Sequence, residues 1–161
     1  MLIPNNHPLA NVNDAFNAVF VHGKAMDDAM FMGRGAGQMP TASAVVGDII
    51  DVCRNIVHDS CGRIGCCCYK NLEVKDITDT KSKFFLRIEA LDKQGVLANI
   101  ASVLGNNDVS IAQVVQKSRK DGVAELVIIT DVVAEKNFND AMTVFNGLSV
   151  VKEIAGVIRV Y

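Results

Sequence analysis

The C-terminal half of the chain, from Lys83 to Tyr161, carries the pattern that most restricts the fold. Every second residue from Phe84 to Ala90 is apolar, which predicts a half-buried strand because successive strand side chains point to opposite faces. Apolar residues then recur at helical spacing from Val96 to Leu104. The polar run from Gly105 to Asp108 ends that helix.

Four further elements complete this region. Val109–Gln116 predicts a second strand, and the hairpin signal Asp121-Gly122 joins it to a third strand over Val123–Val132. A helix over Glu135–Phe145 and a strand over Val150–Val160 follow. The order strand-helix-strand-strand-helix-strand is typical of ferredoxin-like domains, in which two helices cover one face of an antiparallel sheet. The expected fold class is therefore α+β.

A glycine-rich turn before a long helix dominates the front of the chain. The run from Gly33 to Gly37 has glycine at alternate positions, which gives the backbone freedom and a bare surface. Pro40 and Thr41 then predict the first turn of a helix that reaches Val57, with the threonine as N-cap. Apolar residues occupy one side of this helix only. Free N–H groups at its start would face whatever lies above the turn.

Two apolar runs, Asn17–His22 and Ala29–Met32, precede that turn and predict two strands. Both are apolar at successive positions, so both faces of these strands need cover, which one helix cannot provide. Residues 1–58 are therefore expected to be an incomplete α/β segment of a larger body. A linker is predicted at 59–82 and a complete domain at 83–161, because the composition changes sharply between them.

Composition narrows the class of protein. The 161 residues are 50% apolar with a formal net charge of −2, which does not suggest a nucleic-acid partner. Met1 to Ala10 holds no cluster of positive charge, and no apolar run is long enough to span a membrane. A cytoplasmic location is the expectation.

Four of the five cysteines, Cys61, Cys66, Cys67 and Cys68, lie in one short tract. An odd number of cysteines without secretory features favours reduced thiols over a disulfide framework. The tract lacks a second pair of ligands at zinc-site spacing, so a connector is favoured over a metal or redox site. A thiol or metal protein remains a third, weaker interpretation, and no metal is expected.

The glycine turn and the helix after it resemble the end of the catalytic region in homoserine dehydrogenases. The resemblance rests on Gly35-Ala36-Gly37 followed by Pro40-Thr41-Ala42-Ser43-Ala44-Val45 and Asp48, and on His7-Pro8-Leu9-Ala10. It implies an NAD or NADP cofactor whose nicotinamide end lies near Gly35, Ala36 and Gly37. A packing turn that never touches cofactor is the alternative for this run. The resemblance places the catalytic residues upstream, so these 161 residues alone are predicted to be inactive.

The C-terminal region resembles ACT domains, which sense amino acids in biosynthetic enzymes. The matching runs are Phe84–Arg87, Asp92–Leu97 and Val109–Gln116, with Gln94 where many members have proline. The resemblance implies an amino-acid effector, by analogy threonine, bound between the subunits of a homodimer or larger homo-oligomer. The implied contacts come from one subunit's helix start and its neighbour's second strand: Asp92, Gly95, Val96, Val109, Ser110 and Ile111. Asp92 as a helix cap and Ser110 as an ordinary strand hydroxyl are the alternatives.

Two functions of different classes remain open. The first is the C-terminal part of an NAD(P)-dependent homoserine dehydrogenase, with the end of its catalytic domain followed by an ACT domain. The second is a free-standing ACT-type regulatory or assembly module without catalysis. An assay of the chain with homoserine and NADP is the observation that separates them. No turnover is expected, and measurable activity would overturn the claim of a truncated catalytic unit.

Overall fold

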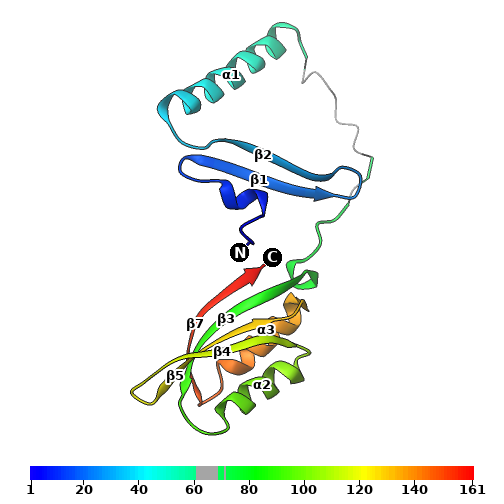
Figure 1. Ribbon diagram of the computed structural model, residues 1–161. Helices are drawn as coiled ribbons and strands as arrows, with labels where there is room; N and C mark the ends of the chain where they lie inside the picture. Colours follow the sequence, from blue (N-terminus) through cyan, green and yellow to red (C-terminus); the bar gives the residue numbers. More distant parts are fainter. Residues whose placement is uncertain (61–68, 71) are drawn as a thin grey trace. The chain divides into compact units, whose positions relative to one another are not determined.

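The computed structural model describes residues 1–60, 69–70 and 72–161, so the tract from Cys61 to Cys68 lies outside the described residues. The chain divides into two compact units (Figure 1). The hairpin unit comprises Pro4–Leu72, and the sheet unit comprises Met1–Ile3 together with Glu73–Tyr161.

The sheet unit is built on four long antiparallel strands. In sequence they are β3 (Lys81–Leu91), β4 (Ile111–Lys120), β5 (Val123–Thr130) and β7 (Val151–Val160). Across the sheet their order is β4-β5-β3-β7, so the first strand of the unit is central. A two-residue strand, β6 (Val133–Ala134), pairs with the start of β3.

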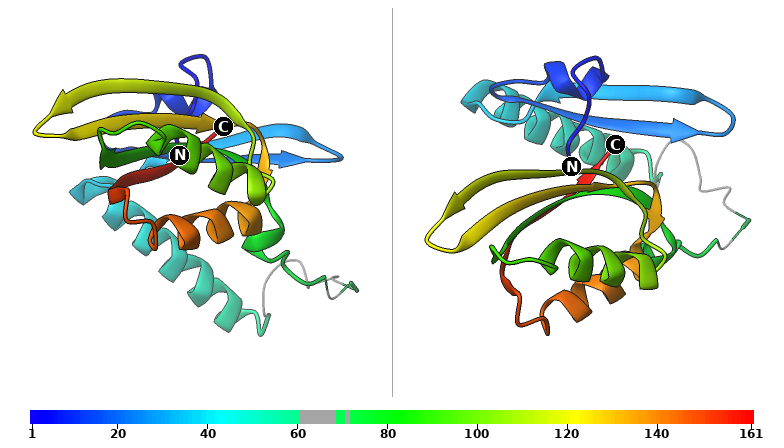
Figure 2. Two further views of the ribbon diagram at one scale, coloured as in Figure 1. Left: turned by 90° about the horizontal axis from the view of Figure 1, so that it is seen from below. Right: turned by 60° about the horizontal axis from the view of Figure 1, so that its bottom comes forward.

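Two helices, α2 (Val96–Asn106) and α3 (Glu135–Phe145), cover one face of this sheet (Figure 2). A short 3-10 helix, η2 (Ile77–Asp79), precedes β3 and is capped by the Asp76 carboxylate. The α+β class and the predicted order of strands and helices are confirmed, with β6 as an addition.

The core of the sheet unit lies between the sheet and its helices. Alternate residues of β3 and β5 enter it, as the period of two predicts, and meet one face of each helix. The Phe84 and Phe138 rings stack within it, with their centroids 3.7 Å apart. Its largest apolar side chains are Phe84, Leu86, Ile88, Ile100, Leu104, Ile128, Phe138 and Phe145.

The second strand of the sheet unit begins two residues later than predicted. Asp108 adopts a left-handed backbone conformation, and the Val109 amide donates to the Leu104 carbonyl at 2.9 Å. Val109 therefore belongs to the turn that ends α2, and β4 starts at Ile111. The predicted Asp-Gly hairpin is confirmed, with φ of 52° at Asp121 and 74° at Gly122.

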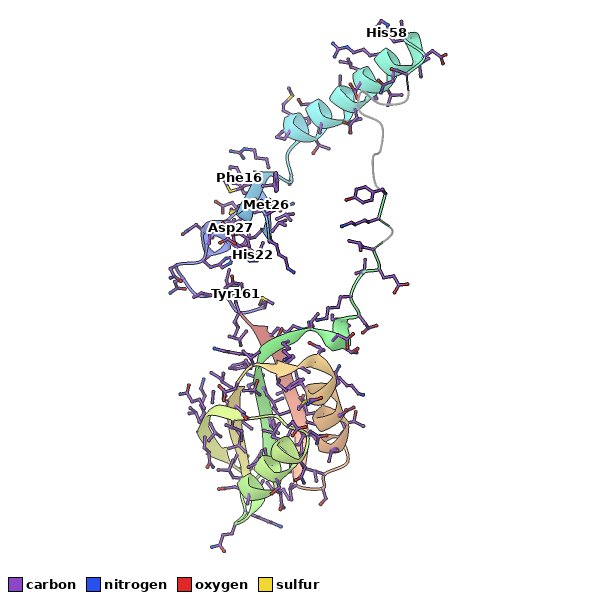
Figure 3. The ribbon with its side chains drawn as sticks, turned by 90° about the vertical axis from the view of Figure 1, so that its right-hand side faces the viewer. Phe16, His22, Met26, Asp27, His58 and Tyr161 are labelled. Atoms are coloured by element: carbon purple, nitrogen blue, oxygen red, sulfur yellow. The ribbon has the colours of Figure 1, made fainter. Side chains whose placement is uncertain are left out.

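The hairpin unit contains two antiparallel strands, β1 (Phe16–Gly23) and β2 (Asp27–Arg34), and the long helix α1 (Gln38–Val57). A 3-10 helix, η1 (Pro8–Asn11), leads into β1. The predicted strands and helix are present. Figure 3 shows α1 leading away from the hairpin to His58, so the helix does not cover the strands.

Hardly any side chain is buried in the described part of the hairpin unit. His7 is the one buried residue there, and no residue of α1 is buried. Large apolar side chains of both strands and of the helix are exposed: Val19, Phe31, Met32, Val45, Val46, Ile49, Ile56 and Val57. This matches the expectation of uncovered strand faces.

Candidate functional site

Two glycines of the turn between β2 and α1 lie close to neighbouring atoms. The Gly35 amide donates to the Ala15 carbonyl at 2.8 Å, and a Cβ added at Gly35 would collide with the Asn17 side-chain amide. Gly37 has φ of +126°, and a Cβ there would approach Pro40 Cδ to 3.2 Å. The turn is therefore closely fitted to β1 on one side and to α1 on the other.

Gly37, not Thr41, is the N-cap of α1, so the predicted cap is wrong. The helix begins three residues before Thr41, and the Thr41 amide donates to the Gly37 carbonyl at 3.1 Å as part of the first helical turn. Gly37 reaches a backbone conformation that side-chain-bearing residues rarely adopt, which lets the helix start earlier than a threonine cap would allow.

An open hollow of about 760 Å³ lies over this turn and the first part of α1. Its lining includes Gly35, Ala36, Gly37 and Thr41, together with Val45 of the helix. The first turn of α1 contains no acidic residue and its N-cap has no side chain, so its first N–H groups have no capping group from Gly37. The hollow thus combines a bare backbone, a hydroxyl and an apolar wall, and the predicted residues Gly35, Ala36 and Gly37 all lie in it.

Three predicted effector residues, Asp92, Gly95 and Val96, lie at the start of α2, and the first of them bonds to the hairpin between β4 and β5. Asp92 follows the last residue of β3, and its amide donates to the Gly122 carbonyl at 2.9 Å. Gly95 is the N-cap of α2 in a left-handed conformation, with φ of 82°. Asp92 and Gly95 are both exposed, whereas the Val96 side chain belongs to the hydrophobic core.

The predicted residues from the second strand lie at the other end of α2. Val109 is 2% exposed and packs in the core, so its side chain is not available to a ligand. Ser110 is exposed, and its carbonyl accepts from the Asp131 amide at 2.9 Å. Ile111 is partly buried against the core.

One chain does not bring the two groups of predicted effector residues together. Gly95 precedes the 11 residues of α2, and Ser110 follows them. At a rise of about 1.5 Å per residue, the helix alone separates its two ends by about 16 Å. A site that uses both groups therefore needs a second copy of the sheet unit.

Sequence reasoning missed one polar pair of the sheet unit. The Glu135 carboxylate, at the buried start of α3, accepts from Arg159 Nε at 2.9 Å and from Arg159 Nη2 at 2.5 Å. These bonds raise the pKa of the Arg159 guanidinium above its ordinary value. The pair joins the start of α3 to the end of β7. No sequence signal links residues 24 positions apart in this way.

The metal interpretation rests on Cys61–Cys68, which lie outside the described residues, so it stays untested. Among residues 1–60, 69–70 and 72–161, no group of three or more His, Cys, Asp or Glu side chains is placed to hold a metal ion. Cys53 is exposed on α1 as a free thiol. No helix within these ranges is long and apolar enough to cross a membrane.

Known families match both parts of the chain. Residues 1–50 match the homoserine dehydrogenase family, and residues 84–149 match the ACT domain family. The first match contains the glycine turn and most of α1, and the second contains both groups of predicted effector residues.

Curated relatives match over nearly the whole chain. Homoserine dehydrogenase from Corynebacterium glutamicum is 40% identical over 159 residues, which are 98% of this chain and 35% of the relative. The corresponding enzyme from Bacillus subtilis is 39% identical, with 99% of this chain and 37% of the relative covered. The chain thus spans a little over one third of the length of these relatives.

A crystal structure of a homoserine dehydrogenase from Thiobacillus denitrificans is similar in fold as well as sequence. It has a TM-score of 0.78 and 32% identity, and the match covers 99% of this chain and 37% of that one. The predicted family resemblance is confirmed. The chain belongs to the homoserine dehydrogenase family, of which it carries the end of the catalytic region followed by an ACT domain.

Proposed function

We propose that this chain serves as the closing part of the catalytic unit and as the amino-acid sensor of an NAD(P)-dependent homoserine dehydrogenase. The parent reaction interconverts aspartate semialdehyde and homoserine. The proposal rests on the hollow over Gly35–Gly37. The same chain also holds an ACT domain. No catalytic residue is assigned to this chain.

The glycine turn fits a nicotinamide nucleotide. Gly35 and Gly37 present backbone without side chains, and the first turn of α1 holds no carboxylate that would repel a phosphate or a carboxamide oxygen. Bound NAD or NADP would supply the hydride acceptor or donor. The role of Gly35, Ala36 and Gly37 is to hold its nicotinamide end, with Gly37 as the most important residue.

The chain by itself is expected to show no turnover with homoserine and either NAD or NADP. Its sequence contains neither a dinucleotide-binding fingerprint nor a lysine-carboxylate group matching the family's proton-transfer residues. A measurable rate above the buffer control would contradict this assignment.

A chimera tests the cofactor contact directly. The matching C-terminal portion of the Bacillus subtilis relative is replaced by this chain, and the rate of homoserine oxidation is measured. We expect activity, with the Gly37→Ala variant raising the KM for NADP at least tenfold. Gly47→Ala is the matched control, since a Cβ at Gly47 meets nothing within 4 Å. An unchanged KM for NADP in the Gly37→Ala chimera would mean that the turn serves packing only and does not contact the cofactor.

The effector we propose is threonine, bound between two copies of the sheet unit. Asp92 pairs with the ammonium group, the backbone at Gly95 and Val96 receives the carboxylate, and Ser110 and Ile111 of the second copy form the other wall. The exposed side chains of Asp92 and Ser110 and the left-handed N-cap at Gly95 support this arrangement. Val109 contributes through its backbone alone, because its side chain is buried.

Calorimetric titration tests the effector, with isoleucine, methionine, lysine and serine as comparison ligands. We expect heat with threonine, and its loss in Asp92→Ala but not in Asp140→Ala, an exposed aspartate on α3. Sedimentation gives the oligomeric state, expected to be at least a dimer. Unchanged threonine affinity in Asp92→Ala would remove that residue from the site.

The second candidate is a regulatory or assembly module without catalysis. The closed core of the sheet unit favours it, because a unit with its own interior can fold without the rest of an enzyme. An inactive chimera combined with threonine binding by the chain would favour this candidate over the first.

A further inference from the structure

The sheet of the sheet unit has two unlike faces. Helices α2 and α3 pack on one face, which contributes alternate residues of β3 and β5 to the core (Figure 2). The intervening residues point to the other face, because successive strand side chains alternate. We name this second surface the open face; Phe85, Val127 and Ile158 lie on it.

The middle of the open face is apolar. Phe85 of β3 pairs with Ile129 of β5 on one side and with Ile158 of β7 on the other. In the next row, Val127 of β5 pairs with Val115 of β4. Ile158 and Val115 are 37% and 39% exposed, and Phe85 and Ile129 are half-buried. These residues, from four strands, form an apolar belt outside the core, and contiguous exposed apolar surface is typical of interaction sites.

Three glutamates lie side by side at one end of the apolar belt. Glu89 of β3 pairs with Glu125 of β5 and with Glu153 of β7, so three carboxylates occupy neighbouring strands on the open face. Like charges directly opposite each other weaken strand pairing. Arg87 Nη1 lies 3.8 Å from Glu125 Oε1 and offsets part of this charge. This end of the open face is therefore predominantly acidic, at a cost to the sheet itself.

Two lysines lie at the opposite end of the apolar belt. Lys81 and Lys83 alternate with the core residues of β3, as Phe85 and Glu89 do, so they belong to the open face as well. Both lysines are exposed. Along β3 the open face thus changes from basic through apolar to acidic. At about 3.3 Å per residue, the distance from Lys83 to Glu89 along the strand is about 20 Å.

We propose that the open face binds the open face of a second copy of this chain, with the two β3 strands antiparallel. A twofold axis between the copies, crossing β3 near Leu86, brings the apolar belts together at a sheet spacing of about 10 Å. Lys83 and Glu89 are equally far from Leu86 in sequence, so Lys83 of each copy meets Glu89 of the other. A parallel arrangement would instead place lysine opposite lysine and glutamate opposite glutamate. Charge thus selects both the partner and its orientation.

This contact does not rest on the proposed effector site. Asp92, Gly95 and Ser110 lie on either side of α2 in the sequence, and α2 covers the other face of the sheet. Four strands about 4.8 Å apart, over about 20 Å of strand length, give roughly 400 Å² for each copy. Such an area is small for a specific interface, so the contact is expected to form reversibly and to weaken as salt screens the charges.

Thiol crosslinking on the full chain tests the contact and its orientation. The five native cysteines are replaced by serine, and chains with Lys83→Cys and with Glu89→Cys are mixed. The crosslinker is a bismaleimide that spans about 10 Å, the distance between packed sheets. We expect mass spectrometry to find links between the two chains at least tenfold more often than links of either chain to itself. Lys136→Cys, at an exposed position on α3, is the matched control and should give background links only.

Charge reversal provides the second arm, measured by sedimentation without threonine. Lys83→Glu and Glu89→Lys should each raise the dissociation constant of the contact at least tenfold. The chain with both reversals should return to within threefold of the unchanged chain, because each lysine again meets a glutamate. A variant that merely folds poorly would not be rescued in this way.

Two results would overturn the contact. Links of each chain to itself, or links no more frequent than with Lys136→Cys, would mean that the open face has another orientation or another occupant. Single reversals without effect, or a double reversal without rescue, would mean that Lys83 and Glu89 do not meet between copies.

Discussion

The hairpin unit and the sheet unit have similarly apolar sequences but opposite packing. In the sheet unit the apolar positions of β3, β5, α2 and α3 meet in one interior. In the hairpin unit the apolar side chains of β1, β2 and α1 remain exposed, and the described residues include a single buried side chain, His7. Secondary structure alone therefore does not make a domain, because stability requires apolar faces that meet.

The difference also assigns different roles to the two units. A closed unit keeps its shape without help and can present a ligand site at its surface, whereas an open unit gains stability from whatever covers it. The extra length of the curated relatives provides a candidate for that cover.

The largest effect is expected from removing an aromatic ring. Phe138 is 1% exposed and stacks on Phe84, so Phe138→Ala should lower the free energy of unfolding by about 3–5 kcal/mol. Phe31→Ala, at a position 66% exposed in β2, should change it by less than about 0.5 kcal/mol. Urea titration followed by circular dichroism measures both. Equal losses would contradict the contrast between the units.

The ion pairs of the two units give the next contrast. Glu135 is buried and accepts two bonds from Arg159, so Glu135→Ala should cost about 1.5–3 kcal/mol of unfolding free energy. His22 and Asp28 lie 2.7 Å apart but are exposed, so Asp28→Ala should cost less than about 1 kcal/mol.

A double-mutant cycle with Arg159→Ala isolates the coupling between Glu135 and Arg159. Zero coupling would show that the pair does not form in solution.

Glycine substitutions in the hairpin unit should act in opposite directions. Gly37→Ala forces a side chain into the conformation at φ of +126° and should cost about 1–3 kcal/mol locally. Gly47→Ala, inside α1 with open space around it, should stabilise the helix by about 1 kcal/mol. Helical ellipticity at rising temperature measures the change in helix stability in both variants. A loss of helix in Gly47→Ala would contradict the open space around Gly47.

The smallest effect concerns Asp76, which caps η2 ahead of the sheet unit. Hydrogen bonds from the Thr78 hydroxyl and amide lower the pKa of its carboxyl below the usual value for aspartate. Because the folded pKa is the lower one, the stabilisation is present above the unfolded pKa and is lost as the pH falls through the folded pKa. An NMR titration should show the Thr78 amide shifting at that acidic pH, and not in Asp76→Ala. A Thr78 titration identical in both proteins would disprove the cap.

The local fold of the sheet unit could be predicted because its patterns are regular. Alternation in β3, the helical stripe of α2 and the Asp121-Gly122 turn each determine a local conformation by a short-range rule. The start of β4 was misplaced, because the left-handed conformation at Asp108 and the bond from Val109 to α2 depend on tertiary context. The Glu135–Arg159 pair could not be predicted from the sequence either, because it too depends on tertiary context.

The candidate sites were less predictable than the fold. Gly37 is the N-cap of α1 because of its backbone conformation. Residue preferences alone predict Thr41 as the cap, since threonine is a common N-cap residue. The separation of Gly95 from Ser110 could be predicted, because the helical pattern from Val96 to Leu104 lies between them, and α2 has that position. Strand addition by Leu2 joins residues from opposite ends of the chain and leaves no local pattern.

Amide exchange over the whole chain is the most direct measurement of the contrast between the two units. We expect the amides of β3 and β5 to exchange only through global unfolding, and those of β1 and β2 to exchange at least about a hundredfold faster through local opening. Protection of β1 and β2 equal to that of β3 and β5 would contradict the account, because it would mean that the hairpin unit has a stable interior of its own.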